Sequence, residues 1–143
     1  MGFFNTMDVS ASGLTAQRLR LDVISNNIAN ANTTRTKEGG PFRRERVVFQ
    51  ERNTGKSFRS YLDTEKSAGV KAVAIEKDTA PFKILYDPTH PDADSTGYVM
   101  LPNVNIVTEM VDMVSAARSY EANVTAINSA KSMMSKALEI SKI

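Results

Sequence analysis

The sequence of 143 residues lacks cysteine and tryptophan and has a single histidine, His90. Without cysteine the chain has no disulfide framework, no thiolate nucleophile and no cysteine-ligated zinc or iron–sulfur site. With one histidine it has no metal site built from several histidines. No glycine-rich phosphate loop and no nucleophile-elbow motif occurs either. We therefore expect no catalytic residues, no metal and no cofactor, and a protein that is not an enzyme.

Long apolar runs are also missing. No stretch approaches the roughly 18–20 apolar residues that span a bilayer, and the N-terminal residues lack the basic and apolar regions of a secretory signal. We expect no direct membrane insertion and no cleaved signal peptide.

The formal net charge is only +2, which argues against nucleic acid as a partner. The one basic stretch, residues 35–59, carries eight basic and three acidic residues. A small nucleic-acid binder would use Arg43, Arg44 and Arg46 there. Because few aromatic residues are interleaved for base stacking, we favour a solvated loop and hairpin.

Proline is confined to the middle of the chain, where all five residues lie between Pro41 and Pro102. Both ends are therefore free to form long helices. We divide the chain into an N-terminal helix within 1–34, a β-rich middle module with an extended loop at 35–102, and a C-terminal helix within 103–143.

Apolar residues recur with helical spacing at the N-terminal end, at Met7, Leu14, Leu21 and Ile28, with Ile24 beside them. This pattern predicts a helix over about residues 5–31. The asparagine-rich segment that follows competes for backbone hydrogen bonds and should end the helix.

The C-terminal end carries two apolar rows with alternating spacings of three and four residues, which is typical of a coiled-coil seam. The first row is Ile106, Met113, Tyr120, Ile127 and Met134, and the second is Met110, Ala117, Val124, Lys131 and Leu138. We predict a helix of about 40 residues, capped by Asn103 or Asn105. Because this helix is longer than the N-terminal one, part of its seam is left unpaired and implies partners.

Four short runs rich in β-branched and aromatic residues lie between the helices, at 43–50, 57–62, 70–76 and 82–86, with turns at 53–55 and 68–69. They predict a small antiparallel sheet followed by an extended loop at 87–94. His90 and the aspartates of this loop could suggest a metal or acid–base site, but a proline-rich structural turn is the better interpretation. The expected fold class is mainly α with a small β module, the two terminal helices pairing as a coiled-coil-like layer.

Two groups of motifs carry a family resemblance. The segments SGLTAQRL (12–19) and NNIANANT (26–33) resemble the N-terminal signature of bacterial flagellar axial proteins. The segments YDPTHPDAD (86–94), GYV (97–99), PNVN (102–105), EMVDM (109–113) and RSYEAN (118–123) resemble the proximal-rod proteins of the FlgC type. The resemblance covers nearly the whole chain.

This resemblance implies a structural subunit of the flagellar basal-body rod, the shaft that transmits torque across the periplasm. Its implied partners are other rod subunits, the base of the rod at the membrane ring and the flagellar type III export apparatus, with hetero- and homo-assembly into a tube. Asn26, Asn27, Asn30 and Asn32 carry the family motif. The helix and subunit contacts are expected at Leu14, Leu21, Ile24, Ile28, Ile106, Met110, Met113, Ala117, Tyr120, Val124, Ile127, Met134 and Leu138. A cytoplasmic coiled-coil adaptor is the alternative that the helices alone allow.

Overall fold

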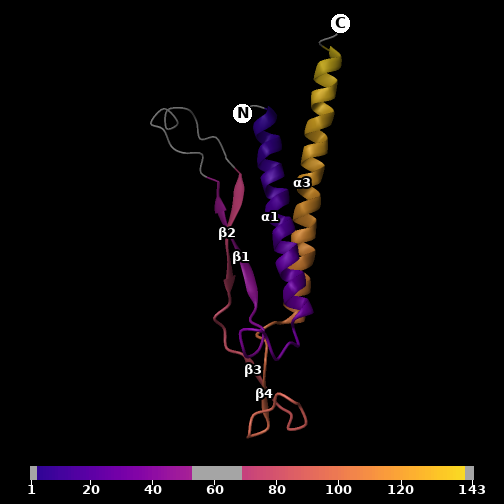
Figure 1. Ribbon diagram of the computed structural model, residues 1–143. Helices are drawn as coiled ribbons and strands as arrows, with labels where there is room; N and C mark the ends of the chain where they lie inside the picture. Colours follow the sequence, from indigo (N-terminus) through magenta and orange to yellow (C-terminus); the bar gives the residue numbers. More distant parts are fainter. Residues whose placement is uncertain (1–2, 53–68, 141–143) are drawn as a thin grey trace, which may run out of the picture.

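The computed structural model describes residues 3–52 and 69–140. Two long helices, α1 (Phe3–Ala29) and α3 (Ile106–Ile140), flank four short strands. The strands are β1 (Glu45–Glu51), β2 (Val70–Lys77), β3 (Lys83–Tyr86) and β4 (Tyr98–Leu101). The expected fold class, mainly helical with a small β module, is confirmed (Figure 1).

The two helices lie side by side and run antiparallel (Figure 1). Gly13 of α1 faces Asn123 of α3, and Arg20 pairs with Asp112. Small side chains fill the seam, since Ala16 and Ala116 are among the buried residues. A Cβ atom at Gly13 would lie 3.1 Å from the Asn123 amide, so the glycine that weakens the helix locally also lets the two helices approach closely. Neither described helix is long and apolar enough to cross a membrane.

Asparagines mark both helix boundaries at the base of the pair. The Asn105 side chain accepts a hydrogen bond from the Val107 amide at 3.1 Å, which caps α3. Asn103, the other candidate cap, instead accepts from the Arg44 amide at 2.8 Å. At the end of α1, the Asn30 side chain donates to the Asn26 carbonyl at 3.0 Å, and the chain leaves the helix through a turn.

Strands β1 and β2 form an antiparallel ribbon that packs on α1 and pairs Glu45 with Lys77 and Glu51 with Val70. The register shifts between Val48 and Phe49. The predicted runs 43–50 and 70–76 correspond to these strands. The predicted strand 57–62 and the turn 53–55 lie outside the described residues.

The predicted strand 82–86 forms β3, but the sequence did not indicate its partner, β4. Instead of one sheet followed by an open loop, the described residues form two separate two-stranded sheets, and the 87–94 loop is closed by β4. Tyr86 pairs with Tyr98, and their rings meet edge to face at 5.2 Å between centroids. Gly97 has a φ of +81°, which allows the chain to turn back into β4.

Gly69 gives a direct test of how the ribbon is attached to α1. Its φ is +89°, and an added Cβ would clash with the Ser12 hydroxyl, which accepts a hydrogen bond from the Val70 amide at 3.1 Å. We expect Gly69→Ala to lower the free energy of unfolding by about 2–3 kcal/mol, through backbone strain together with this clash.

Gly39→Ala is the matched control for chemical denaturation. Gly39 has a φ of +87° but nothing within 4 Å of the added Cβ, so it should show only the strain of about 1–2 kcal/mol. Equal decreases in the free energy of unfolding for Gly69→Ala and Gly39→Ala would contradict the proposed attachment of β2 to α1.

Candidate functional site

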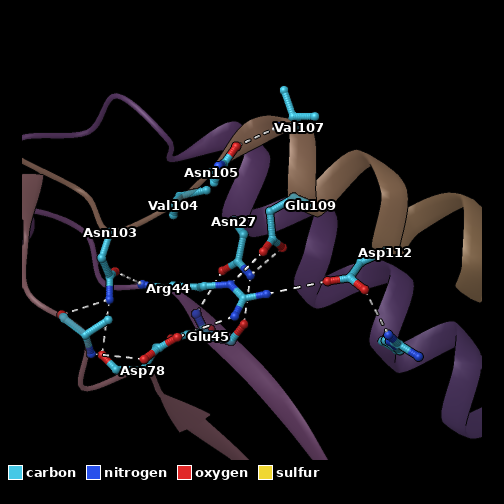
Figure 2. Close-up of polar contacts among 12 residues, drawn as sticks. Asn27, Arg44, Glu45, Asp78, Asn103, Val104, Asn105, Val107, Glu109 and Asp112 are labelled. Carbon is cyan, nitrogen blue, oxygen red and sulfur yellow. Dashed lines mark hydrogen bonds and ion pairs between the residues drawn. The ribbon is translucent and has the colours of Figure 1, made fainter.

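A buried polar cluster lies where the helices, the β1–β2 ribbon and the loop before α3 meet (Figure 2). Its centre is Glu109 of α3, whose exposed fraction is 1%, as is that of Asn27 of α1. Around them lie Arg44, which precedes β1, Asp78, which follows β2, and Asp112 of α3. We call these five residues the Glu109 cluster.

Asn27 uses its whole amide group in the cluster. Its Oδ1 accepts from the Glu45 backbone amide at 2.9 Å, and its Nδ2 donates to the Glu45 carbonyl at 2.7 Å. The same Nδ2 donates to Glu109 Oε2 at 3.0 Å. One side chain therefore joins α1 to the start of β1 and to α3, and it satisfies polar groups that would be expensive to bury unpaired.

Arg44 compensates the buried Glu109 carboxylate. Its Nε donates to Glu109 Oε1 at 2.6 Å, while its two terminal nitrogens lie 3.4 Å from Asp78 Oδ2 and 3.6 Å from Asp112 Oδ2. Burial by itself would lower the pKa of Arg44, but its bonds to Glu109 and Asp78 outweigh that effect and raise this pKa. The Ala80 amide chiefly, and Arg44 as well, hold the pKa of Asp78 below its usual range. The charged forms of the Arg44 guanidinium and of the Asp78 carboxylate are thus stabilised.

Two further side chains extend the cluster. Asn103 Nδ2 donates to the backbone carbonyls of Asp78 and Ala80, at 3.3 and 3.1 Å. Arg20 of α1 lies 3.3 Å from Asp112 Oδ1. Because every group has a partner and the partners come from separate segments, the arrangement functions as a structural joint.

The acidic groups of the cluster are bound by neighbouring side chains. Its carboxylates pair with an arginine and an amide, and Glu109 is shielded from solvent. Across the described residues, no three histidine or carboxylate side chains gather as metal ligands. In the loop at 87–94, His90 Nδ1 accepts from the Asp92 amide at 3.1 Å, a contact that belongs to a turn.

The sequence did not indicate this joint. Glu109 stands one position before the apolar Met110 and reads as an ordinary surface charge, and Arg44 reads as part of the basic stretch. Arg43, next to it, lies over the Phe82 ring at 4.2 Å and donates to the Asp78 carbonyl at 2.9 Å. Two of the three arginines on which the nucleic-acid alternative depends are therefore engaged inside the molecule.

The expected contact residues divide into two groups. On α1, Ile24 is buried, and Leu14, Leu21 and Ile28 are half-buried. On α3, the half-buried members are Met113, Ala117, Val124, Ile127 and Met134, while Ile106, Met110, Tyr120 and Leu138 are exposed. The buried positions of α3 are Glu109, Ala116 and Ala130, in a row one residue before the predicted Met110, Ala117 and Lys131. Alanines in this row allow close helix contact, and larger side chains are displaced outward.

The asparagines of the family motif also take different positions. Asn27 is buried in the cluster, whereas Asn26 and Asn30 interact with each other at the end of α1, with 2.9 Å between the two side chains. Asn32 is exposed. Of these four asparagines, Asn27 is the one whose side-chain contacts described above connect α1 to β1 and to α3.

An apolar stripe lies on the face of α3 that points away from α1. It consists of Val107, Met110, Val111 and Val114, which follow one another at helical spacing. Val107 and Val111 are 71% and 65% exposed. We call these four residues the outer stripe. An uncovered apolar face of this kind is typical of a protein–protein contact.

Asn27→Ala tests whether the motif asparagine is structural. The change removes three hydrogen bonds in the buried joint, so we expect the free energy of unfolding to fall by about 2–3 kcal/mol. Asn32→Ala, from the same motif but exposed, should change it by less than about 0.5 kcal/mol. Chemical denaturation measures both, and a similar effect of the two substitutions would contradict the assigned role of Asn27.

Two segments of the chain match known protein families. Residues 7–37 match the family described as "Flagella basal body rod protein", and residues 95–140 match "Flagellar basal body rod FlgEFG protein C-terminal". These matched ranges contain α1 from Met7 onward and all of α3.

Curated relatives match over their full length. The flagellar basal-body rod protein FlgC of Borreliella burgdorferi is 55% identical, with 98% of each chain covered. FlgC of Bacillus subtilis is 51% identical over 99% of this chain and 100% of its own. FlgC of Salmonella typhimurium is 40% identical, with 98% of both covered. These relatives support a structural rod protein of the basal body and give no support to the coiled-coil adaptor. The chain belongs to the FlgC family of flagellar basal-body rod proteins.

Proposed function

We propose that this rod subunit is built into the shaft through the outer stripe of α3, and that the Glu109 cluster transmits force between its helices and its β1–β2 ribbon. The observation that carries the proposal is the uncovered stripe itself. Val107, Met110, Val111 and Val114 are all exposed in the single chain, on a helix whose other face is already occupied by α1.

The small hydrophobic core between the two helices supports the proposal that the chain needs neighbouring subunits. Two antiparallel helices have one shared seam, and here small residues such as Ala16, Ala116 and Ala130 fill it. Such a pair buries little apolar surface, and the hydrophobic contribution to stability scales with that surface. Covering the outer stripe in the assembly adds apolar burial that the isolated chain lacks.

The small hydrophobic core is also consistent with export of an unfolded chain before assembly. In our proposal the subunit leaves the cytoplasm through the flagellar type III apparatus and takes its place in the periplasmic part of the rod. A chain with a thin core unfolds at little cost, and the ordering entropy of its helices is offset by interface burial on assembly. Its partners there are other rod subunits, of its own and other kinds, and the base of the rod at the membrane ring.

Torque transmission needs parts that do not slide past one another. Arg44 connects to Glu109 and Asp112 of α3 and to Asp78 beyond β2. Asn27 ties α1 to the same point. A force applied to either helix is thereby shared with the ribbon.

A charge on the outer stripe tests this assignment. We expect Val107→Asp and Val111→Asp to remove the chain from detergent-extracted basal bodies and to abolish motility, because a carboxylate would have to be buried in the contact. Folding of the isolated chain should be almost unchanged, since both side chains are exposed, and an acid at position 107, in the first turn of α3, favours the helix.

The matched control is Thr125→Asp. Thr125 is exposed and lies 18 residues after Val107, about five helical turns along the same face. This variant should be recovered with basal bodies. Normal motility of both Val107→Asp and Val111→Asp would refute the proposal.

A further inference from the structure

Gln17 of α1 holds a buried polar atom without a partner. Its Oε1 is shielded from solvent, and among the described residues it is the one buried side-chain nitrogen or oxygen that makes no hydrogen bond. An unpaired buried acceptor destabilises a folded chain, whereas an apolar side chain of the same shape in its place does not. By contrast, Asn27 and Glu109 in the Glu109 cluster have partners for both of their polar atoms. The unpaired oxygen of Gln17 therefore requires an explanation of its own.

Gln17 lies on the side of α1 that faces α3. Gly13, four residues earlier, lies against Asn123, and Arg20, three residues later, binds Asp112. Residues three and four apart share a face of a helix. The unpaired oxygen of Gln17 therefore belongs to the seam between the two helices.

A hydroxyl donor lies at the same level of the seam on α3. Because the helices run antiparallel (Figure 1), four residues forward from Gly13 on α1 correspond to four residues back from Asn123 on α3, which leads to Ser119. Each of these steps is about 6 Å along its helix. Ser119 is half-buried, and its hydroxyl donates to the Ser115 carbonyl of its own helix at 2.9 Å. The acceptor on α1 and this donor thus share one level of the seam, and the donor is bonded elsewhere.

The helix does not need the bond that the Ser119 hydroxyl makes. The Ser115 carbonyl lies inside α3, where it accepts the backbone amide four residues later in the chain, as interior carbonyls of an α-helix do. A serine hydroxyl that bonds to such a carbonyl adds little stability and often bends the helix. When the hydroxyl turns away, α3 loses no backbone hydrogen bond. The Ser119 hydroxyl is therefore available for another acceptor.

Small side chains leave room for the helices to come closer at this level. Ala16 precedes Gln17, and Ala116 lies one turn before Ser119; both alanines are buried. Val114, the last residue of the outer stripe, is five residues before Ser119 on the face of α3 that points away from α1. A neighbouring subunit that covers the outer stripe therefore contacts α3 from the side opposite the seam, close to the level of the unpaired oxygen.

We propose that this part of the seam is a conformational device, in which the Ser119 hydroxyl turns to donate to Gln17 Oε1 when a neighbouring subunit covers the outer stripe. Packing from the far side holds α3 against α1, and the new hydrogen bond stabilises that closer state. In the isolated chain the acceptor stays unpaired and the helix pair is weaker. The inference rests on the proposed rod function, because the contact that drives the change is the one proposed for the outer stripe.

Gln17→Met tests the unpaired acceptor in the isolated chain. Methionine has nearly the same length and shape but no amide, so loss of the unpaired oxygen should raise Tm by about 2–4 °C. The matched control is Gln50→Met on β1, where the side chain is exposed, and it should shift Tm by less than about 1 °C. A Tm of Gln17→Met that is not above that of the wild type overturns the proposal, because Oε1 would then be bonded already in the isolated chain.

Ser119→Ala distinguishes the isolated chain from the assembled one. In the isolated chain it should behave like Thr125→Ala, which removes the equivalent 2.9 Å bond to the Glu121 carbonyl on the exposed side of α3. In the rod, Ser119→Ala should lower recovery with detergent-extracted basal bodies about fivefold relative to a co-expressed wild-type copy, as expected for the loss of one hydrogen bond. Thr125→Ala should be recovered like the wild type. Equal recovery of the two variants contradicts the proposal.

The double variant Gln17→Met/Ser119→Ala gives an independent readout. Gln17→Met alone should also lower recovery with basal bodies about fivefold, since it removes the same hydrogen bond from the other side. If both side chains act through one bond, the double variant should be recovered about as well as either single variant. Losses that multiply in the double variant would rule out a shared bond.

The two proposals fail in different ways. A wild-type chain that is absent from basal bodies contradicts the rod function itself. A wild-type chain that is recovered normally, together with equal recovery of Ser119→Ala and Thr125→Ala, retains the rod function and refutes the change in the seam.

Discussion

The buried carboxylate of Glu109 is the constraint on which the rest of the structure depends. It sits on α3 with an exposed fraction of 1%, and a charge in that position requires nearby partners. Arg44 supplies the compensating charge at 2.6 Å and Asn27 a hydrogen bond at 3.0 Å. These partners come from the start of β1 and from α1, so satisfying one side chain fixes both helices and the ribbon relative to one another. The joint is specific because it is polar, whereas the alanine-rich seam alone would tolerate sliding.

This joint separates two kinds of surface. On one side of α3, small residues such as Ala116 and Ala130 bring the helices close together. On the other side, the outer stripe is exposed in the single chain, and the β3–β4 hairpin and the C-terminal end of α3 lie at opposite ends of the molecule (Figure 1). A chain of this size thus presents more contact surface than its core can use, which suits a subunit of a rod.

The sequence predicted the elements better than their contacts. Both helices, strands β1 to β3 and the fold class follow from periodicity, from the confinement of proline to the middle and from the asparagine-rich end of α1. Strand β4 was not predicted because it depends on the turn at Gly97, where φ is +81°, and on pairing with β3 across the intervening loop. The Glu109–Arg44 ion pair was not predicted because its members are 65 residues apart in the sequence. Hydrophobic spacing also favours Met110 over Glu109, since no periodic pattern marks a buried, compensated charge.

A double-mutant cycle between Glu109 and Arg44 tests the central claim most directly. Glu109→Ala and Arg44→Ala should each lower the free energy of unfolding by roughly 3 kcal/mol, because Arg44→Ala leaves the buried carboxylate without its compensating charge and Glu109→Ala removes the shortest bond of Arg44 and one hydrogen bond of Asn27. The double variant should lose little more than either single one, which gives a coupling energy of about 2 kcal/mol or more. Additive losses of stability from the two substitutions would contradict the claim that this ion pair joins the helices to the β1–β2 ribbon.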